Sequence, residues 1–516
     1  MSSNYLTYFE KKDKLSQNIL TKGEKMTEEL TGTEQRQVRL GKLKTLESQG
    51  INAYPQIYRP SITAKELEEK YAVLENDVQT EDVVKVAGRV KAIRNSGMFI
   101  DLYDPSGKVQ IYTSLEHITP EQQNMLDLLD IGDIIGVEGC VRRTKRGQLS
   151  VTAKTFTMLA KALLPLPDKF HGLTDTDTKY RQRYLDMIVN EDTTRTLINR
   201  SKIITAIRKL LLDKGILEVE TPLLHTIKGG ASAKPFITHH NALDMDLFLR
   251  VAPELHLKRL IVGGLEGVFE IGRNFRNEGI DTRHNPEFTM MEVYRQYNDY
   301  TDMMTLFEEI CEAAAMAVHG TTEIEIDGKK INLKGPFPRR TMADLVKEYA
   351  GVDFMEIKTD EEAREACDKL GVYVAEDADW GHCMAAVFEE KCEKHLIQPV
   401  HVLDHPKSLS PLTKTHRNDD RLVERFESYI NTWEMCNAYT ELTNPLDQRE
   451  RFEDQVKARE AGDEEADMMD DDYVTALEYG LAPTGGLGVG IDRLIMVVTN
   501  HTSIRDIIAF PTMRKK

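Results

Sequence analysis

Residues 268–297 carry charged, aromatic and apolar side chains in an order that fits a β-hairpin. The stretch reads VFEIGRNFRNEGIDTRHNPEFTMMEVYRQY. Successive side chains on a strand point to opposite faces. In the second half, one face is therefore apolar, and the other holds an aromatic ring, a carboxylate and a phenol from Phe288, Glu292 and Tyr294. A solvated hairpin does not need this combination, so the sequence predicts a binding site on the polar face.

The end of this hairpin adds further charge. Arg276 and Glu278 end the first strand, and Arg283 and His284 lie in the loop. Arginine side chains bind phosphate oxygens through two parallel hydrogen bonds, and an aromatic ring such as that of Phe288 can stack on a base. The pattern indicates a nucleotide site.

A glycine-rich strand near the C-terminus, GLGVGIDR at residues 486–493, supports this interpretation. Its glycines alternate with apolar residues, so one face is bare and a flat ligand can lie on it. Arg493 follows and can cover the second face of a purine. The spacing is not GxGxxG, and the chain has no P-loop sequence, so Rossmann and P-loop nucleotide sites are both excluded.

Two further carboxylates, Glu434 and Glu441, are the oxygen donors that Mg²⁺ requires. They are seven residues apart, so a regular strand would place them on opposite faces. Both can reach one metal cluster only if the strand bends or bulges near Asn437 and Ala438. No Ser-His or Cys-His nucleophile is indicated, which leaves positioning and charge neutralisation at phosphorus.

Residues 83–165 have a different character and predict a small β-barrel. Five strand-like runs lie at 83–90, 97–104, 108–113, 133–144 and 149–160, and a helix is expected at 118–129 between the third and fourth. An OB-fold has this arrangement and binds single-stranded nucleic acid. The net charge of −18 argues against nucleic acid, but this segment carries more Lys and Arg than Asp and Glu. A purely structural barrel is the alternative.

The rest of the chain can be divided by composition. Residues 1–33 are polar and are expected to be a disordered extension, with Met26 as a second possible start. Residues 34–82 contain two expected helices, a long helix is expected at 194–214, and the acidic residues 463–472 are expected to be a solvated loop. The chain has neither a signal-type segment nor a run of about 20 apolar residues, so a cytoplasmic protein without membrane contact is expected.

These motifs resemble the class II aminoacyl-tRNA synthetases, and among them the lysyl-tRNA synthetases of bacterial type. The three class motifs correspond to the helix ending at Gly215 with VETP at 219–222, to FRNE through RHNPEF at 275–288, and to residues 486–493. The segments GGASAKPF, RVAPELHLKRL and CNAYTEL also match, and the resemblance runs from about residue 35 to the end. The loop at 94–98 is shorter than in many members.

The resemblance implies an α+β fold. An antiparallel sheet with flanking helices would form the catalytic domain at 166–516, preceded by an N-terminal OB-fold anticodon-binding domain at 83–165 and by helices at 34–82. It also implies a homodimer through the first motif. The activity would be ATP-dependent ligation of L-lysine to tRNA(Lys), with Mg²⁺, through a lysyl-adenylate and with transfer to the tRNA's 3′-OH.

Residue roles follow from the same resemblance. Arg276 and Arg493 would be catalytic, and ATP would be bound by Arg276, Glu278, Arg283, His284, Phe288 and Arg493. Lysine would be bound by Gly230, Glu254, Glu292, Tyr294 and Asn437. Anticodon bases would be bound by Arg94, Phe99 and Gln110, and Mg²⁺ by Glu434 and Glu441.

A carboxylate at Glu292 favours lysine over the acidic or amide substrates of related enzymes, because a buried carboxylate is stabilised by an ammonium and repels aspartate. Two alternatives stay open. One is a tRNA-independent lysine ligase acting on a protein, although such relatives resemble the catalytic domain without a barrel. The other is a non-catalytic nucleic-acid-binding homologue, although Arg276, Glu278 and Arg493 are all present.

Overall fold

A computed structural model describes residues 32–114, 118–167, 173, 175–462 and 465–515. The chain divides into two compact units, Met1–His171 and Gly172–Lys516. Disorder was expected for residues 1–33, and residues 1–31 of that segment lie outside the described residues. Residues 32 and 33 belong to helix α2 (Gly32–Ser48). No helix within the described ranges has the length and apolarity needed to cross a membrane.

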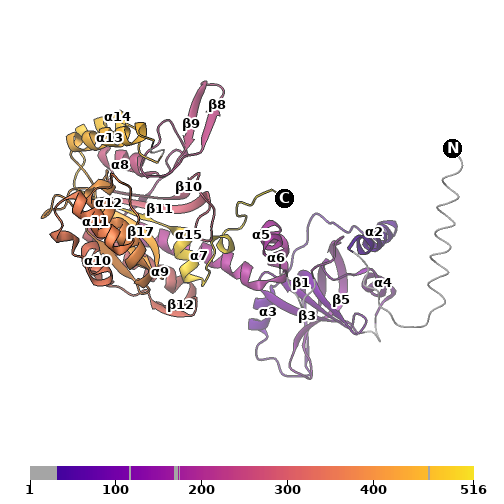
Figure 1. The fold of residues 1–516 in the computed structure, drawn as a ribbon. Helices are drawn as coiled ribbons and strands as arrows, with labels where there is room; N and C mark the ends of the chain where they lie inside the picture. Colours follow the sequence, from indigo (N-terminus) through magenta and orange to yellow (C-terminus); the bar gives the residue numbers. More distant parts are fainter. Residues whose placement is uncertain (1–31, 115–117, 168–172, 174, 463–464, 516) are drawn as a thin grey trace. The chain divides into compact units, whose positions relative to one another are not determined.

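The first unit is built on a closed five-stranded barrel, as predicted (Figure 1). The order is β1-β2-β3-β5-β4, with β1 (Gln79–Arg94), β2 (Phe99–Asp104), β3 (Gly107–Tyr112), β4 (Ile134–Arg143) and β5 (Leu149–Ala160). The expected helix is α4 (Pro120–Leu128), which a capping box at Thr119 begins. Its Met125 and Leu128 pack in the barrel core, together with Leu46 of α2 and Leu67 of α3 (Ala64–Lys70).

The second unit contains an eight-stranded sheet, which confirms the predicted α+β fold. Its order is β14-β15-β16-β17-β18-β11-β10-β6, and only the outer pairs β14–β15 and β10–β6 are parallel. In that order the strands are β14 (Arg339–Thr341), β15 (Val400–Leu403), β16 (Arg425–Ile430), β17 (Trp433–Thr440), β18 (Thr484–Val489), β11 (Glu287–Gln296), β10 (Gly267–Phe275) and β6 (Leu217–Glu218). The predicted hairpin is β10–β11, paired from Gly267–Arg295 to Phe275–Glu287.

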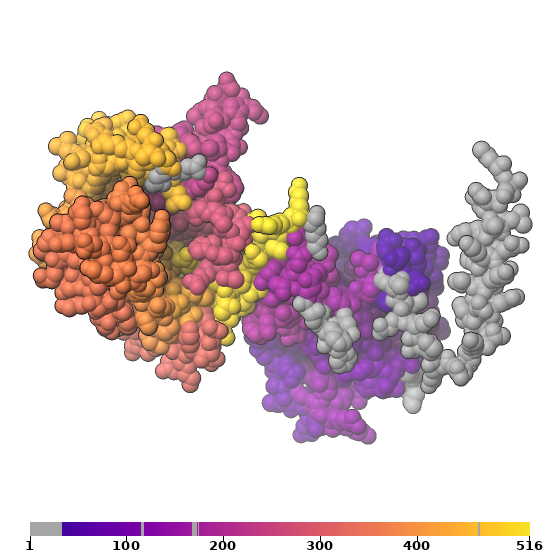
Figure 2. Space-filling model, viewed as in Figure 1, coloured from indigo at the N-terminus to yellow at the C-terminus, as the bar shows by residue number. Residues whose placement is uncertain are grey.

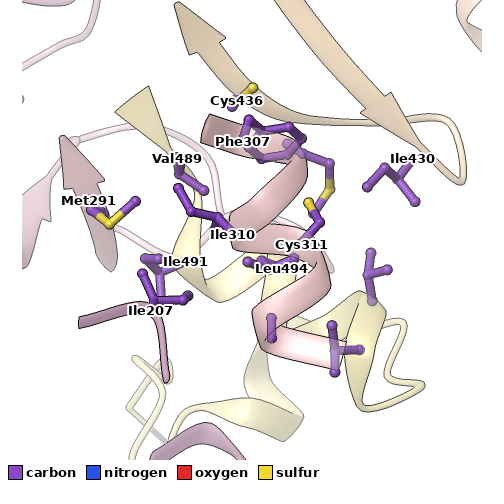
Figure 3. Close-up of a cluster of buried hydrophobic side chains, with 14 of the residues drawn as sticks. Ile207, Met291, Phe307, Ile310, Cys311, Ile430, Cys436, Val489, Ile491 and Leu494 are labelled. Carbon is purple, nitrogen blue, oxygen red and sulfur yellow. The ribbon is translucent and has the colours of Figure 1, made fainter. Parts of the chain in front are cut away.

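Three helices cover the apolar face of this sheet. They are α7 (Glu191–Asp213), α9 (Tyr300–His319) and α15 (Ile491–Val498). A capping box at Asp299 begins α9, and Gly320 ends it in the left-handed conformation. Figure 3 shows Phe307 and Ile310 of α9 packed with Leu494 of α15 and with Val489 of β18. The opposite face of the sheet is thereby left for polar residues.

Smaller elements complete the second unit. Helices α10, α11 and α12 enclose a separate core beside β15 and β16, and α8, α13 and α14 pack together at the other end (Figure 1). The hairpin of β8 and β9 projects from the unit (Figure 1). The bounds of these elements are α5 (Thr176–Arg181), α6 (Arg183–Val189), β7 (Leu224–His225), β8 (Ile237–His240), β9 (Met245–Leu249), α8 (Glu254–Val262), β12 (Glu323–Ile326), β13 (Lys329–Asn332), α10 (Met342–Ala350), η1 (Phe354–Glu356), α11 (Asp360–Leu370), α12 (Trp380–Val387), η2 (Phe388–Cys392), η3 (Glu393–His395), η4 (Lys407–Leu409), α13 (Pro445–Glu460), α14 (Asp471–Glu478) and α16 (Ile504–Ile507).

One helix ends irregularly, and one local expectation is wrong. Helix α12 is followed by a π-helical turn η2 and a 3₁₀ turn η3. Residues 463 and 464 of the acidic stretch lie outside the described residues. The part at 465–472 is not simply a solvated loop, because Asp467 and Asp470 are buried and α14 begins at Asp471. Asp470 caps α14 and accepts two hydrogen bonds from Arg259, so its burial is compensated by a partner.

Candidate active site

The polar face of β11 lines a cavity of about 460 Å³ in the second unit. Phe288, Glu292 and Tyr294 face this cavity, while Met291 and Val293 are fully buried in the core on the opposite side. The alternation read from the sequence is therefore confirmed. Figure 2 shows the surface hollowed between the orange and the pink segments, the colours of β16–β17 and of β10–β11.

The glycines of β18 are required by the protein's own side chains. Gly488 pairs with Glu292, and Gly486 pairs with Tyr294. A Cβ at Gly486 would lie 1.9 Å from Glu441 Oε1 and 2.7 Å from the Tyr294 ring, and a Cβ at Gly488 would lie 2.9 Å from the Met290 methyl group. The bare strand was expected to receive a flat ligand, but at these two positions it accommodates side chains that shape the cavity.

The expected nucleotide residues gather at one end of the cavity. Arg276, Glu278, Arg283, His284, Phe288 and Arg493 all line it. The Arg276 guanidinium lies 5.2 Å from the centre of the Phe288 ring. Arg493 donates to the backbone oxygen of Glu434 at 2.6 Å, and its Nη2 lies 3.1 Å from His284 Nε2.

This end of the cavity is suited to an anion. The Arg276 Nε is buried and makes no hydrogen bond within the described part of the chain. A buried cationic donor without a partner is costly unless a ligand supplies the acceptor. Arg283 and Arg493 line the same end, and Arg493 is also paired with Glu434 at 3.3 Å. Phosphate oxygens would supply acceptors to these guanidinium groups.

The other end of the cavity has an excess of carboxylates. Glu254, Glu292 and Glu441 are all buried, and one ammonium, that of Lys258, lies among them. Lys258 Nζ donates to Glu254 Oε1 at 2.6 Å and is paired with Glu441. The Tyr439 hydroxyl also donates to Glu254 Oε1, at 2.6 Å.

Protonation follows from this burial. Burial, reinforced by the charge of Glu254, raises the pKa of Glu292 to about 8, against the hydrogen bond that Tyr294 donates at 3.0 Å. Burial also raises the pKa of Glu441 well above its usual value. Burial lowers the pKa of Lys258, but the charges of Glu254 and Glu441 outweigh it and raise that pKa well above the ordinary range. A ligand carrying an ammonium would therefore stabilise this end.

The two remaining residues expected for lysine also line the cavity. Gly230 has a φ of 88°, a left-handed conformation that favours glycine, in the loop facing Glu254. Asn437 lies on β17 opposite Gly488, and its Oδ1 accepts a hydrogen bond from Arg425 Nε at 2.9 Å. All five residues expected for lysine thus line the cavity.

Strand β17 has a bulge, at Met435 rather than near Asn437, where a shared metal site would have needed it. Ser428 pairs with Cys436 and Tyr429 pairs with Glu434, so Met435 is the extra residue. Glu434 and Glu441 then lie on the same face. Seven residues of strand still separate their Cα atoms by about 20 Å, and Glu441 is fully buried against Lys258. The structure therefore does not bring these two carboxylates to one metal position.

Glu427 is the carboxylate nearest to Glu434 by strand register. Tyr429 pairs with Glu434, and Glu427 lies two residues before Tyr429 on the same face, so the two acids are diagonal neighbours about 7–8 Å apart at the backbone. Both line the cavity. They also act together on Tyr429, whose pKa is raised first by burial and then by the charges of Glu427 and Glu434. Each is also paired with an arginine, Glu427 with Arg425 at 2.6 Å and Glu434 with Arg493 at 3.3 Å. Their oxygen donors and spacing fit a hard divalent cation that would share them with these arginines.

The expected anticodon residues form one patch on the barrel. Arg94 pairs with Phe99 across β1 and β2, and Phe99 pairs with Tyr112 across β2 and β3, with their rings 5.5 Å apart. Gln110 lies on the same face as Tyr112, and its Oε1 accepts from Ser150 Oγ at 2.9 Å. Arg94 donates to Asp101 at 2.7 Å. Two aromatic rings thus lie beside one arginine and one amide, which are groups that single-stranded nucleic-acid sites use.

Sequence reasoning missed three residues of the cavity region. Lys258 had a signal, because it follows Glu254 by four residues on a helix and so faces it. Glu427 could be recognised as a neighbour of Glu434 only after the pairing of β16 with β17 was known. Asp467 was assigned to a solvated stretch, and its place in the cavity depends on contacts with a distant part of the chain.

Comparison with protein families agrees with this architecture. The family of tRNA synthetases class II (D, K and N) matches residues 175–514, and the OB-fold nucleic acid binding domain matches residues 69–159. The chain therefore belongs to the class II tRNA synthetases of the D, K and N group.

Curated relatives narrow the similarity further. The lysine--tRNA ligase of Sinorhizobium medicae is 52% identical over 481 residues, 93% of this chain and 97% of the relative. That of Agrobacterium fabrum is 53% identical over 481 residues, 93% and 96% of the two chains. The lysine--tRNA ligase of Staphylococcus epidermidis is 48% identical over 497 residues, 95% of this chain and all of the relative.

Proposed function

We propose that this protein ligates L-lysine to tRNA(Lys), using ATP and forming a lysyl-adenylate with release of pyrophosphate. The observation that carries the proposal is the division of one cavity into a cationic, aromatic end and a carboxylate-rich end. One end suits the phosphates and base of ATP, and the other suits the ammonium of lysine. The hairpin β10–β11 contributes to both, so the two substrates of the first step meet along it.

At the nucleotide end, Arg276 binds the α-phosphate and the reacting carboxylate of lysine. Phe288 and Arg493 cover the two faces of adenine, and Glu278 accepts from its amino group. Arg283 and His284 contact the outer phosphates. Arg276 and Arg493 reduce the negative charge that opposes attack of the carboxylate on the α-phosphorus, which is the main barrier to this step.

At the other end, Gly230 and Glu254 bind the α-amino group, Asn437 orients the backbone of lysine, and Glu292 with Tyr294 binds the side-chain ammonium. The carboxylate excess supports this assignment, because a bound ammonium stabilises Glu292 in its charged form. Glu441 completes the negative surroundings through Lys258.

Glu434 and Glu427 would hold Mg²⁺ at the phosphate end. The ion would neutralise phosphate charge when bound. Glu441, expected from the sequence to share this role, is fully buried against Lys258 and lies far from Glu434 along β17.

In the second step the 3′-OH of the tRNA takes the lysyl group, and the barrel binds the anticodon through Arg94, Phe99 and Gln110. The proposed product serves translation in the cytoplasm. A homodimer would form through the first motif. Its support is a set of exposed apolar side chains from the end of α7 to β8, where β6 leaves the sheet edge open: Leu212, Leu217, Leu223, Leu224 and Ile237.

ATP–pyrophosphate exchange measured with each of the twenty amino acids tests the proposal. Lysine should give exchange well above all others, and a purified tRNA pool should then accept radiolabelled lysine. Exchange with another amino acid, or none with lysine, would refute the assignment. Lysine exchange without tRNA charging would instead favour a tRNA-independent ligase, against which the barrel argues.

A further inference from the structure

Asp467 is a buried carboxylate in the wall of the cavity. It lies in the segment between α13 and α14 and is 3% exposed. It lines the cavity together with Gly230 and Glu254, and the backbone N–H of Gly230 donates to it. Its Oδ1 makes no hydrogen bond to any residue that the structure describes, and it lies 3.5 Å from Lys228 Nζ.

The segment that carries Asp467 is fixed in position. Lys228 is fully buried and donates to the backbone oxygens of Glu465 and Ala466. Arg459 Nη1 donates to the Ala466 oxygen at 3.2 Å, and the Asp467 N–H donates to Gln455 Oε1 at 3.3 Å. The Lys228 ammonium is therefore shared with two carbonyl groups and does not serve Asp467 alone.

The ion pair with Lys228 compensates the charge of Asp467 only in part. Burial raises the pKa of Asp467 to about 7, Lys228 acts against this, and the charge of Glu254 adds to it. Asp467 and Glu254 thus repel each other across the same part of the cavity. An ammonium placed between them would stabilise both carboxylates.

We propose that Asp467 acts with Glu254 as a second carboxylate that binds the α-ammonium of the amino-acid substrate. The inference rests on the proposed function, in which the carboxylate of lysine lies at Arg276 and its side chain at Glu292. The α-carbon then lies between these two ends, and its ammonium faces the wall formed by Gly230, Glu254 and Asp467.

The test compares lysine with 6-aminohexanoate, which is lysine without its α-amino group. Binding of both to the full-length wild type and to Asp467→Asn is measured by calorimetry, together with lysine-dependent ATP–pyrophosphate exchange. Asp467→Asn should weaken lysine at least about tenfold, as expected for loss of one charge from a buried pair. It should change the affinity for 6-aminohexanoate less than about twofold, because that ligand lacks the group that Asp467 contacts.

The exchange assay gives a second readout. The KM for lysine should rise while the KM for ATP and kcat stay within about twofold of the wild type, because the contact is made equally in ground state and transition state. Asp471→Asn is the matched control, since Asp471 belongs to the same acidic stretch but its side chain is 74% exposed. This control should behave as the wild type with both ligands.

Two results would overturn the inference. Unchanged lysine affinity in Asp467→Asn would show that the carboxylate does not contact the substrate. Equal losses for lysine and 6-aminohexanoate would show that Asp467 only supports the cavity wall. A wild type that gives no lysine exchange would instead refute the proposed function itself, so the two failures are distinguishable.

Discussion

Replacing Lys258 by Met should expose how strongly the carboxylate-rich end depends on one internal cation. Lys258 is fully buried, and it faces Glu254 and Glu441, which are also buried. Removing one partner of a buried ion pair costs about 3–5 kcal/mol, because the other charge is left uncompensated. Glu254 and Glu441 both lose their cationic partner, but the Tyr439 hydroxyl still donates a hydrogen bond to Glu254. We therefore expect a loss of about 4–5 kcal/mol in the free energy of unfolding at pH 8.

The loss should depend on pH with a definite sign. The pKa of Glu441 is raised by burial against the charge of Lys258, so without that ammonium it lies further above its unfolded value. The variant is therefore least destabilised where Glu441 is protonated, and its stability falls as pH rises through the folded-state pKa of Glu441. The difference from the wild type should be smaller at pH 6 than at pH 8.

Urea unfolding followed by tryptophan fluorescence provides the assay. Both tryptophans of the chain, Trp380 and Trp433, lie in the second unit, so the signal reports on that unit. Adding Glu441→Gln to the Lys258 variant should restore part of the stability, because one uncompensated charge is removed. The control is Lys209→Met, an exposed lysine. A loss below about 1 kcal/mol, or an equal loss at both pH values, would refute the reasoning.

Three further predictions concern the two substrates and the core. Glu292→Gln should lower lysine affinity on the order of 100-fold with the KM for ATP unchanged. Burial raises the pKa of Glu292 to about 8, so lysine binding at pH 7 should release more protons from the wild type than from the variant, in which only Asp467 can still lose one. Calorimetry in two buffers measures this, and equal proton release would contradict it. Phe99→Ala should reduce kcat/KM for tRNA by roughly tenfold, through loss of base stacking, with pyrophosphate exchange unaffected; equal charging would exclude the barrel patch. Burial lowers the pKa of His401 to about 4. The second unit should therefore lose stability, up to about 3 kcal/mol, as pH falls from 6.5 towards 4, because the unfolded chain binds the proton first. In urea titrations His401→Gln should weaken this pH dependence, and an unchanged dependence would show that another group is responsible.

Much of the fold could be predicted because it follows from local patterns. The alternation in β11 predicted which side chains face the cavity and which face the core, and the structure confirms the division. The strands of the barrel and the helices α10 and α11 follow from short-range periodicity and from residues that begin and end helices. These features depend on neighbours a few positions apart, which a sequence displays directly.

The parts that could not be predicted depend on distant partners. Asp467 lies in an acidic run that looks solvated, and its burial rests on Lys228, which donates to a carbonyl 238 positions further along the chain. The metal carboxylates show the same limit. Parity allowed Glu434 and Glu441 to share a metal only if the strand bulged near Asn437. The bulge lies at Met435, and only the pairing with β16 reveals that Glu427, not Glu441, is the neighbour of Glu434.

The extra residue Met435 has a consequence for how this site could evolve. Deleting Met435 would make the side chains of β17 alternate regularly along its whole length. Either Glu434 or the residues from Asn437 to Glu441 would then point towards the apolar core. The reverse change, a second insertion, would have the same effect. The number of residues between Glu434 and Asn437 is therefore fixed, because a change of one residue on either side would reverse the facing of the other. Variation in substrate is expected to occur by side-chain replacement along β17 rather than by insertion or deletion.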